Sequence, residues 1–557
     1  MSKLRILFVF LVLVAAFSLE RSSTAPRSDF DRSRLEQVED LSEALANDLL
    51  DFSVAARRKD LGAMRSYLAA SLKATPTPSQ PGENKPASRW TEEHAWQQSP
   101  TPMTIAREAY LQQWAEFLNH FSELEDVRFK VKFATFPSPG TGKADLKFFL
   151  IGRGCQGRRE WVSGTARVTA EKAAAEKSRW RISEMILSPL QSQVATADLF
   201  HEVSFPAGVS MPLPSYGSPG NEGFVWNGAA AADVDRDGLI DVFVTGHPRN
   251  HLYRNLGNGR FQDLAEEAGV AWFYNRATTA LFVDYDNDGD SDLFLSAAGT
   301  QMLFENRLRP SGKLSFEDVS VPAGVDRQAV GFSAAAADVN RDGLPDIYVA
   351  SYNRYGVVMP DAWDRASNGT PNLLFINQGG GRFVEKGREL GAADTRWSYA
   401  ASFADFDGDG DQDLFVANDF GEKGLFLNQD GRFQDVAGER GVLDPGNGMG
   451  VALGDYDNDG LLDLHFANMS STAGNRILQR LFPKSNGASG GVLKKLAAGN
   501  SLYRNQGDGT FRDTTSEVGG FPAGWAWGGG FLDFDNDGFE DLYTSNGFIS
   551  GKSMKDT

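Results

Sequence analysis

The chain has 557 residues, of which 41% are hydrophobic and 23% are charged, a composition typical of a globular protein and not of a disordered one. Its single cysteine, Cys155, excludes an internal disulfide framework and a cysteine-based zinc site, and its six histidines form no HExxH motif. The net charge of −19 argues against a nucleic-acid partner, whose phosphates require clustered Lys and Arg.

The charge divides the chain into two parts. Residues 1–199 carry 27 Lys and Arg against 24 Asp and Glu, a net charge of +3. Residues 200–557 carry 28 against 50, a net charge of −22. The second part therefore contains a feature that requires or tolerates dense carboxylates.

The N-terminus has the form of an export signal. Lys3 and Arg5 precede an unbroken apolar run over 6–17, and small residues allow cleavage after Ser18. Twelve apolar residues are too few to span a hydrocarbon core of about 30 Å, and no later run is long enough to do so. We expect a signal peptide at 1–18, with an uncleaved signal anchor as the alternative, and a secreted or extracytoplasmic chain without a transmembrane span in its mature form.

After a linker at 19–34, residues 35–190 are predicted to form a small α+β domain. Leu41, Leu45, Leu49 and Phe52 share one face of a helix, and Asp60 is a plausible N-cap for a second one. A third helix is expected around 111–121. A Pro-rich segment at 71–103 is predicted to be a mobile loop.

The period then changes to two, which predicts strands at 127–133, 144–152, 159–170 and 178–187. Helices followed by an antiparallel meander, closed by a Trp180-Arg-Ile182 strand, resemble the nuclear-transport-factor-like fold. Some proteins of this kind are enzymes. Since no His–Asp pair occurs at a suggestive spacing, we expect a structural or docking module.

Six copies of one acidic motif, D-x-[DN]-x-D-G-x-x-D, dominate the second part of the chain. They lie at 233–241, 284–292, 338–346, 405–413, 455–463 and 533–541, and we call them loops 1 to 6. Of the 24 residues at positions 1, 3, 5 and 9, 23 are Asp and one is Asn340. Six loops in phase are a strong signal, where one would be weak.

The motif has the chemistry of a hard-cation site. Carboxylates at positions 1, 3 and 5 converge on one point, the Gly at position 6 permits the turn, and the position-7 carbonyl and the position-9 Asp complete the oxygen shell. We expect up to six Ca²⁺ ions, about one per loop, with Mg²⁺ the lesser candidate. The predicted ligands are Asp233, Asp235, Asp237, Leu239, Asp241, Asp284, Asp286, Asp288, Asp290, Asp292, Asp338, Asn340, Asp342, Leu344, Asp346, Asp405, Asp407, Asp409, Asp411, Asp413, Asp455, Asp457, Asp459, Leu461, Asp463, Asp533, Asp535, Asp537, Phe539 and Asp541.

An EF-hand is excluded because position 12 is apolar or Thr and not acidic (Val244, Leu295, Val349, Val416, Phe466, Thr544). These residues lie in strand-like runs, so each loop connects two strands. Each unit continues into an h-x-x-N-x-G-x-x-F segment, in which h is a hydrophobic residue. With this segment, each repeat has four short strands. Such repeats predict a mainly β fold, an integrin α-like β-propeller over 199–557 with six recognisable blades, or seven.

The segment Phe200–Val209 matches the outer strand that follows loop 1, so we expect it to be an outer strand that completes the last blade. The repeats resemble the FG-GAP/VCBS calcium repeats of integrin α-type propellers. Their A-G-V, D-x-D-x-D-G-x-x-D-L and L-Y-R-N-x-G-x-G-x-F rhythm is most similar to the cartilage acidic protein/UnbV-type family. That resemblance implies an extracellular, calcium-bound scaffold for adhesion or recognition of an extracellular protein or a glycan, without the further C-terminal domain of those relatives.

Two further sets of residues are candidates for function. Aromatic and Arg side chains on the loops between blades are candidates for partner binding or for packing between blades: Trp272, Tyr274, Arg276, Arg396, Trp397 and Trp525. The alternative to a binding scaffold is an extracytoplasmic hydrolase or lyase supported by the propeller. Asp361 and Asp364 are the only acidic pair that we would test for it, and we expect no enzyme.

Overall fold

The computed structural model describes residues 32–154, 156–172, 179–198, 200–210, 228–246, 249–272, 277–354, 357–471, 474–475, 477–478, 488–519 and 523–546. They form two compact units, one that ends at Glu202 and one that begins at Val203. The signal segment at 1–18 lies outside the described residues. No helix in the described part is long and apolar enough to cross a membrane.

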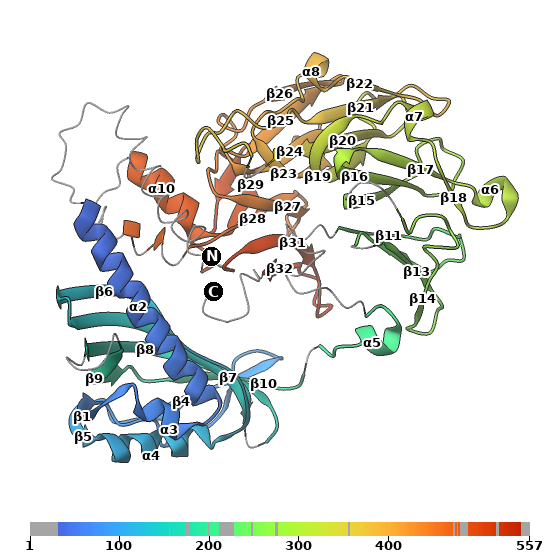
Figure 1. Cartoon of the computed structure of the whole chain (residues 1–557). Helices are drawn as coiled ribbons and strands as arrows, with labels where there is room; N and C mark the ends of the chain where they lie inside the picture. The colour runs from blue at the N-terminus through green and yellow to red at the C-terminus, as the bar shows by residue number, and fades with distance from the viewer. Residues whose placement is uncertain are drawn as a thin grey trace. The chain divides into compact units, whose positions relative to one another are not determined.

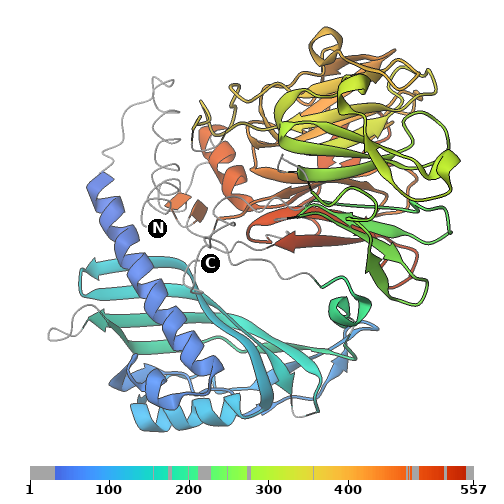
Figure 2. The same cartoon turned by 45° about the vertical axis from the view of Figure 1, so that its right-hand side comes forward.

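Three helices of the first unit pack on a sheet. They are α2 (Arg32–Arg57), α3 (Leu61–Arg65) and α4 (Arg107–Leu118). Figure 2 shows α2 lying across the sheet, and its Leu45, Leu49 and Phe52 are buried in the core. Asp60 caps α3, since its carboxylate accepts the N–H of Ala63 at 2.9 Å. The periodic pattern of apolar residues therefore predicted three helices correctly. Phe121, which was expected in the third helix, instead begins a strand, β6 (Phe121–Ser138).

The sheet of this unit has ten strands, seven of them in the order β2-β4-β10-β8-β9-β1-β5. In addition, β7 pairs with β8 and with β6, and β3 pairs with β4. Their bounds are β1 (Leu68–Ala74), β2 (Gln80–Pro81), β3 (Lys85–Pro86), β4 (Thr91–Gln97), β5 (Met103–Ala106), β6 (Phe121–Ser138), β7 (Thr141–Gly154), β8 (Arg159–Lys172), β9 (Trp180–Leu187) and β10 (Gln191–Ala195). Helices packed on a curved antiparallel meander confirm the α+β class.

The prediction of a mobile loop at 71–103 was wrong. This segment contains β2, β3 and β4, and β4 pairs with β10. His94 and Trp96 of β4 face the core, an alternation that the flanking prolines obscured. Pro81 and Pro86 lie in two-residue strands that pair on one side only, where a missing N–H does no harm.

The second unit is a β-propeller. Five blades have four antiparallel strands each: β11–β14 (Ala229–Ala232, Asp241–Val244, His251–Asn255, Phe261–Asp263), β15–β18 (Ala277–Val283, Asp292–Thr300, Met302–Asn306, Phe316–Asp318), β19–β22 (Gln328–Ala337, Asp346–Ser351, Leu373–Asn377, Phe383–Glu385), β23–β26 (Trp397–Ala404, Asp413–Phe420, Gly424–Gln429, Arg432–Asp435) and β27–β30 (Gly448–Gly454, Asp463–Asn468, Ser501–Asn505, Phe511–Asp513). The first strands β11, β15, β19, β23 and β27 follow one another side by side, and β31 (Ala526–Leu532) lies next to β27 (Figure 1). Apolar side chains fill the space between blades, as Phe243 of β12 and Leu293 of β16 do.

The sixth blade shows only two strands among the described residues, β31 and β32 (Asp541–Asn546). The expectation of an outer strand over 200–209 was wrong, because 200–203 are not in a strand. They lead into a short helical turn, α5 (Ser204–Ala207), which matches α7 (Ser320–Ala323) after β18. Gly208 after it has φ +82° and lies close to the carbonyl of Phe261, as Gly269 lies close to that of Phe316. The Ala-Gly-Val corner therefore forms as in the other blades.

Candidate metal centres

Each acidic loop joins the first strand of a blade to the second. Non-glycine residues rarely have positive φ, yet it occurs at position 4 as well as at the position-6 Gly. The position-4 residues are Arg236 (φ 60°), Asn287 (60°), Arg341 (59°), Gly408 (76°), Asn458 (57°) and Asn536 (54°). The shared backbone shows that the six loops are copies of one turn.

The carboxylates at positions 1 and 5 hold this turn together. In every loop the position-1 carboxylate accepts the N–H of the position-6 Gly, at 2.7 to 3.0 Å. In every loop the position-5 carboxylate accepts the N–H of position 7, at 2.8 to 3.0 Å. The remaining carboxylate lone pairs can bind a cation.

The structure brings three carboxylates together in five of the loops. Oxygens of positions 1, 3 and 9 lie within 4.8 Å of one another in loops 1, 2, 4 and 5, and those of positions 1, 3 and 5 do so in loop 6. The position-5 Asp is not part of the cluster in the first four of these. Loop 3 has Asn340 in place of the second carboxylate, so it offers one negative charge fewer.

The position-9 Asp is the buried member of the clusters in loops 1, 2, 4 and 5. In loops 1 to 5 its Oδ1 accepts the backbone N–H of an Asn at or next to the end of the third strand, at 2.7 to 2.9 Å. Burial raises the pKa of Asp292 to about 8 and that of Asp413 to about 7, from an ordinary value of 3.8. Burial also raises the pKa of Asp241, Asp346 and Asp463. A carboxylate in such a position gains from a nearby cation.

The oxygens fit a hard divalent cation. Buried carboxylate oxygens of Asp235, Asp284 and Asp457 receive no hydrogen bond from the protein, although burial of an unsatisfied charged oxygen is costly. Clustered carboxylates without a cation repel one another, whereas Ca²⁺ takes six to eight such oxygens. Five Asp-rich loops can therefore hold a metal ion, and a residue-level ligand set for each remains a prediction.

Two loops are also contacted by an Arg from the third strand of their own blade, which sequence reasoning did not consider. Arg254 of β13 lies 2.5 Å from Asp235 and 3.1 Å from Asp237 of loop 1. Arg504 of β29 lies 2.7 Å from Asp457 and 2.9 Å from Asp459 of loop 5. The LYRN form of the third strand was the available signal, since loops 2, 3 and 4 have Glu305, Ile376 and Leu427 at this place.

The candidate partner residues lie in different surroundings. Trp397 is fully buried against Tyr352 and Phe420, and its Nε1 donates to Asn368, which corrects its placement on an exposed surface. Arg396 is largely buried and paired with Asp394 and Asp435, so it joins elements of the blades. Trp397 is excluded from solvent and the Arg396 side chain is 17% exposed, which favours the packing alternative for these two residues.

Of the remaining candidates, Trp272 is 61% exposed and Trp525 is partly buried. Tyr274 and Arg276 lie outside the described residues. In the segment between β20 and β21, the Asp361 carboxylate accepts two hydrogen bonds from Ser367, from its N–H at 2.9 Å and its Oγ at 3.0 Å. Asp361 thus stabilises a local turn, and the structure gives it no direct contact with Asp364.

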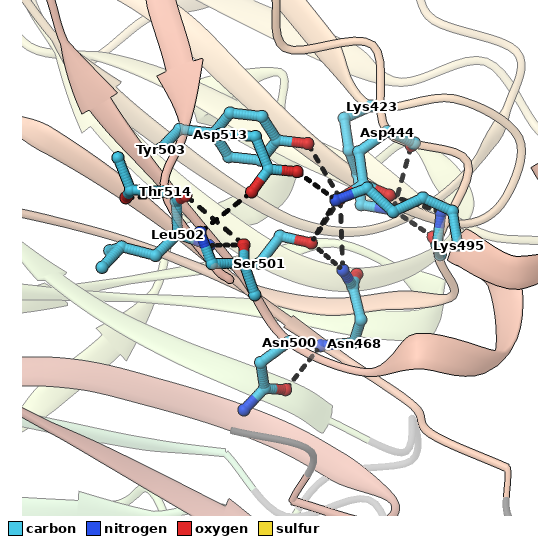
Figure 3. Close-up of polar contacts among 12 residues, drawn as sticks. Lys423, Asp444, Asn468, Lys495, Asn500, Ser501, Leu502, Tyr503, Asp513 and Thr514 are labelled. Atoms are coloured by element: carbon cyan, nitrogen blue, oxygen red, sulfur yellow. Dashed lines mark hydrogen bonds and ion pairs between the residues drawn. The ribbon is translucent and has the colours of Figure 1, made fainter. Parts of the chain in front are cut away.

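A buried polar cluster at the junction of the fourth and fifth blades was also missed (Figure 3). Lys423 is fully buried and donates to the carbonyls of Asn418, Asp444 and Gly446. The Asp444 carboxylate accepts from Ser501 at 2.6 Å and Tyr503 at 3.1 Å. Lys423 occupies the place of Asn250, Gln301, Asn372 and Asn500 in the other blades, so the cluster is a variant of an interblade contact.

The charges of this cluster balance each other. Burial lowers the pKa of Lys423 to about 8, opposed by Asp444 and Asp419. Burial alone would raise the pKa of Asp444, but Lys423 and Lys495 hold it below its ordinary value. This pairing could not be predicted from local spacing in the sequence, because Lys423 and Asp444 belong to different blades. The arrangement stabilises the junction.

The first unit has a second buried network. Glu160 of β8 lies between His94 (3.4 Å) and His120 (3.2 Å) and accepts from Ser192 at 2.5 Å. Asn84 contacts the other ring nitrogen of His94 at 2.8 Å, and burial lowers the pKa of that imidazole. These residues come from distant parts of the chain, and so the search for a His–Asp spacing did not reveal them.

Comparison with known protein families gives one match. The FG-GAP-like repeat model matches residues 233–295, 284–349, 362–416, 405–466 and 492–544, which together include all six acidic loops. Cartilage acidic protein 1 from mouse is 27% identical over 267 residues, which cover 36% of this chain and 41% of the mouse protein. The human protein is also 27% identical over 267 residues, with 40% of its length covered. The chain thus spans less than half the length of these curated relatives.

Two solved structures are among those similar to this chain. A lectin from Agrocybe aegerita, described as recognising non-reducing terminal N-acetylglucosamine, is 14% identical with a TM-score of 0.34, over 86% of this chain and 99% of the lectin. A hexachlorocyclohexane dehydrochlorinase from Novosphingobium barchaimii is 13% identical with a TM-score of 0.18, over 27% of this chain and 92% of that enzyme.

Proposed function

We propose that this chain, an FG-GAP-repeat β-propeller protein, is an exported, calcium-binding recognition scaffold. Calcium ions bind in the acidic loops and stabilise one end of each blade. The propeller then presents its other loops to an extracellular protein or glycan. The chain acts by binding and not by catalysis.

The carboxylate clusters carry the calcium part of this proposal. Asp233, Asp235 and Asp241 come within 4.8 Å of one another, and the same arrangement recurs in three further loops. Buried oxygens in these clusters lack a protein donor. An oxygen-only site of this kind favours Ca²⁺ over transition metals, and its many protein ligands favour Ca²⁺ over Mg²⁺.

The recognition part rests on weaker but independent support. The chain is 27% identical to mouse cartilage acidic protein 1 over 267 residues, and the loops between blades include the exposed Trp272. An exposed Trp is a common anchor in binding surfaces. Export is proposed from the charged and apolar pattern of residues 1–18.

A metal count on the full chain tests the calcium proposal. Protein stripped with a chelating resin is dialysed against Ca²⁺ or Mg²⁺, and bound metal is measured together with the thermal unfolding midpoint. We expect five or six Ca²⁺ per chain and a large rise in the midpoint, since ligand at 100 times Kd stabilises by about 2.7 kcal/mol per site. No bound Ca²⁺ and an unchanged midpoint would contradict the proposal.

Export is tested separately. Residues 1–30 are fused to a reporter that is active only outside the cytoplasm, and the matched control replaces Lys3 and Arg5 with Glu. Activity that depends on the two positive charges supports export. Equal activity of a fusion that lacks residues 1–18 would contradict it.

A further inference from the structure

The acidic loops of neighbouring blades contact each other through the residue at position 4. Arg236 of loop 1 lies 3.5 Å from Asp290 of loop 2, and Asn287 of loop 2 donates to the carbonyl of Gly343 in loop 3 at 3.0 Å. Arg341 of loop 3 lies 2.5 Å from Asp411 of loop 4. Every contact runs from one loop to the next loop in the chain.

The same contact recurs between the last two loops, where Asn458 of loop 5 donates to the carbonyl of Gly538 in loop 6 at 2.8 Å. The positive φ at position 4 turns these side chains out of their own loop. The acceptors lie at positions 6 and 7 of the next loop, directly beside the position-5 Asp. Position 4 itself lies between the carboxylates of positions 3 and 5.

The residue types of neighbouring loops match this role. An Arg at position 4 of loop 1 or 3 is followed by an Asp at position 7 of loop 2 or 4, namely Asp290 or Asp411. An Asn at position 4 of loop 2 or 5 is followed by an apolar residue at position 7, Leu344 or Phe539, and donates to a backbone carbonyl instead. Asp290 and Asp411 therefore have a reason to be acidic besides binding a metal in their own loop.

A second layer of contacts joins the same neighbours. Asn306 of β17 donates its amide to the carbonyl of Val234 in loop 1, and its backbone N–H donates to Asp292 in loop 2. The equivalent amides of Asn377, Asn428 and Asn505 donate to Tyr285, Val339 and Phe406. This layer spans every pair of neighbours from loop 1 to loop 5.

The contacts made by the position-4 side chains are interrupted between loops 4 and 5, whereas the contacts made by the Asn amides are not. Loop 4 has Gly408 at position 4, and a glycine offers no side chain that can reach loop 5. Its φ of +76° suits Asn, and a Cβ placed on it meets no atom within 4 Å. The break therefore comes from a missing side chain and not from a different backbone.

We propose that the position-4 side chains couple the metal loops, so that calcium binding is cooperative within loops 1–4 and within loops 5–6 and is weakly coupled between loops 4 and 5. This inference rests on the proposed function. A metal ion in one loop orders the backbone at positions 5 to 7, which is the acceptor for the preceding loop. The ordered acceptor holds the position-4 side chain of the preceding loop in place. It thereby also orders the carboxylates at positions 3 and 5 of that preceding loop.

Three full-length variants test the coupling. Asn287→Ala removes the contact between loops 2 and 3, and Gly408→Asn adds the missing side chain between loops 4 and 5. Asn536→Ala is the matched control, because Asn536 has the same backbone and, among the described residues, no contact with another loop. Each stripped protein is titrated with Ca²⁺ by calorimetry, with native mass spectrometry to follow the distribution of bound ions.

We expect Asn287→Ala to lower the Hill coefficient and to weaken the mean affinity about five-fold, with an unchanged number of ions. Gly408→Asn should raise the Hill coefficient and reduce the population of half-loaded chains. Asn536→Ala should change neither quantity. Melting midpoints in the absence of metal show that these effects do not come from a general loss of stability.

The outcomes separate the two proposals. Calcium bound in the expected number, with equal Hill coefficients for the wild type, Asn287→Ala and Gly408→Asn, overturns the coupling and leaves the calcium scaffold intact. No calcium bound to the wild type overturns both. If Asn287→Ala fails to fold, Gly408→Asn decides the question, because an unchanged Hill coefficient there contradicts the coupling.

Discussion

Arg341 and Asp411 form an ion pair between two acidic loops, with Nε and Oδ1 2.5 Å apart. The Asp411 side chain is only 5% exposed, while that of Arg341 is 50% exposed. A carboxylate in this position depends on its partner, because an unpaired buried charge is unfavourable.

Arg341→Ala should therefore destabilise the metal-free protein by about 1 to 3 kcal/mol, the cost of an unsatisfied buried polar group. The double variant Arg341→Ala/Asp411→Leu should recover most of that loss, since loops 1, 3 and 5 have Leu at position 7. Urea unfolding of the two variants measures the difference. Equal stabilities would show that Asp411 does not need Arg341.

Arg254→Leu should strengthen calcium binding in loop 1. The guanidinium lies beside Asp235 and Asp237, where its positive charge opposes a cation, and the equivalent residue next to loop 4 is Leu427. Because this side chain is partly exposed, we expect a gain of roughly five-fold in affinity, about 1 kcal/mol. Calcium calorimetry checks it, with Arg260→Leu as a charge-matched control. A loss of affinity would mean that Arg254 positions the carboxylates.

Loop 3 should bind calcium most weakly, because Asn340 replaces a carboxylate. Asn340→Asp should raise the weakest binding constant roughly ten-fold, as ligand charge tunes calcium affinity. Asp235→Asn, the reverse change in loop 1, should create a second weak site. A titration in which Asn340→Asp leaves the weakest constant unchanged would contradict this ranking.

The stability of the metal-free protein should fall as the pH rises from about 5 to 8. The pKa of Asp413 is raised to about 7 and that of Asp292 to about 8, so the folded chain retains protons that the unfolded chain has lost. Each such group changes the free energy of unfolding by about 1.4 kcal/mol per pH unit within its range. Below pH 4 both states are protonated and the dependence ends.

Saturating calcium should reverse this trend, because a bound cation keeps these carboxylates ionised and lowers their pKa. Melting midpoints at pH 5, 6, 7 and 8, on protein stripped with a chelating resin and on calcium-loaded protein, test both signs. A metal-free midpoint that rises with pH would contradict the account of the buried Asp residues.

Lys423→Met should destabilise the protein by about 3 to 5 kcal/mol, because it leaves the carboxylate of Asp444 buried with one cation fewer. Lys495→Met is the control, since Lys495 contacts the same carboxylate at 3.7 Å but is 29% exposed and should contribute less. Urea unfolding compares them. Equal losses would show that burial of the Lys does not set its contribution.

The acidic loops, the strands around them and the propeller class could be predicted from the sequence, because all the information for each loop lies within nine consecutive residues. The alternation over 127–133 and the four-residue steps of Leu41, Leu45 and Leu49 are equally local. The six copies of the loop predicted six recognisable blades, and the FG-GAP resemblance added the expectation of an extracellular, calcium-bound scaffold. The Pro-rich segment misled, since the pairing of β4 with β10 is a contact between distant strands.

Contacts between repeats were decided by the tertiary structure. The sequence by itself determined which residues are acidic and where the backbone turns, since spacing and residue type act over one loop. Only the tertiary structure placed Trp397 in the core, Arg341 beside Asp411 and Lys423 beside Asp444 in the propeller. It also placed Glu160 between two histidines in the first unit. These partners are separated by tens of residues in the chain, and no local spacing encodes a contact that forms only when separate strands meet.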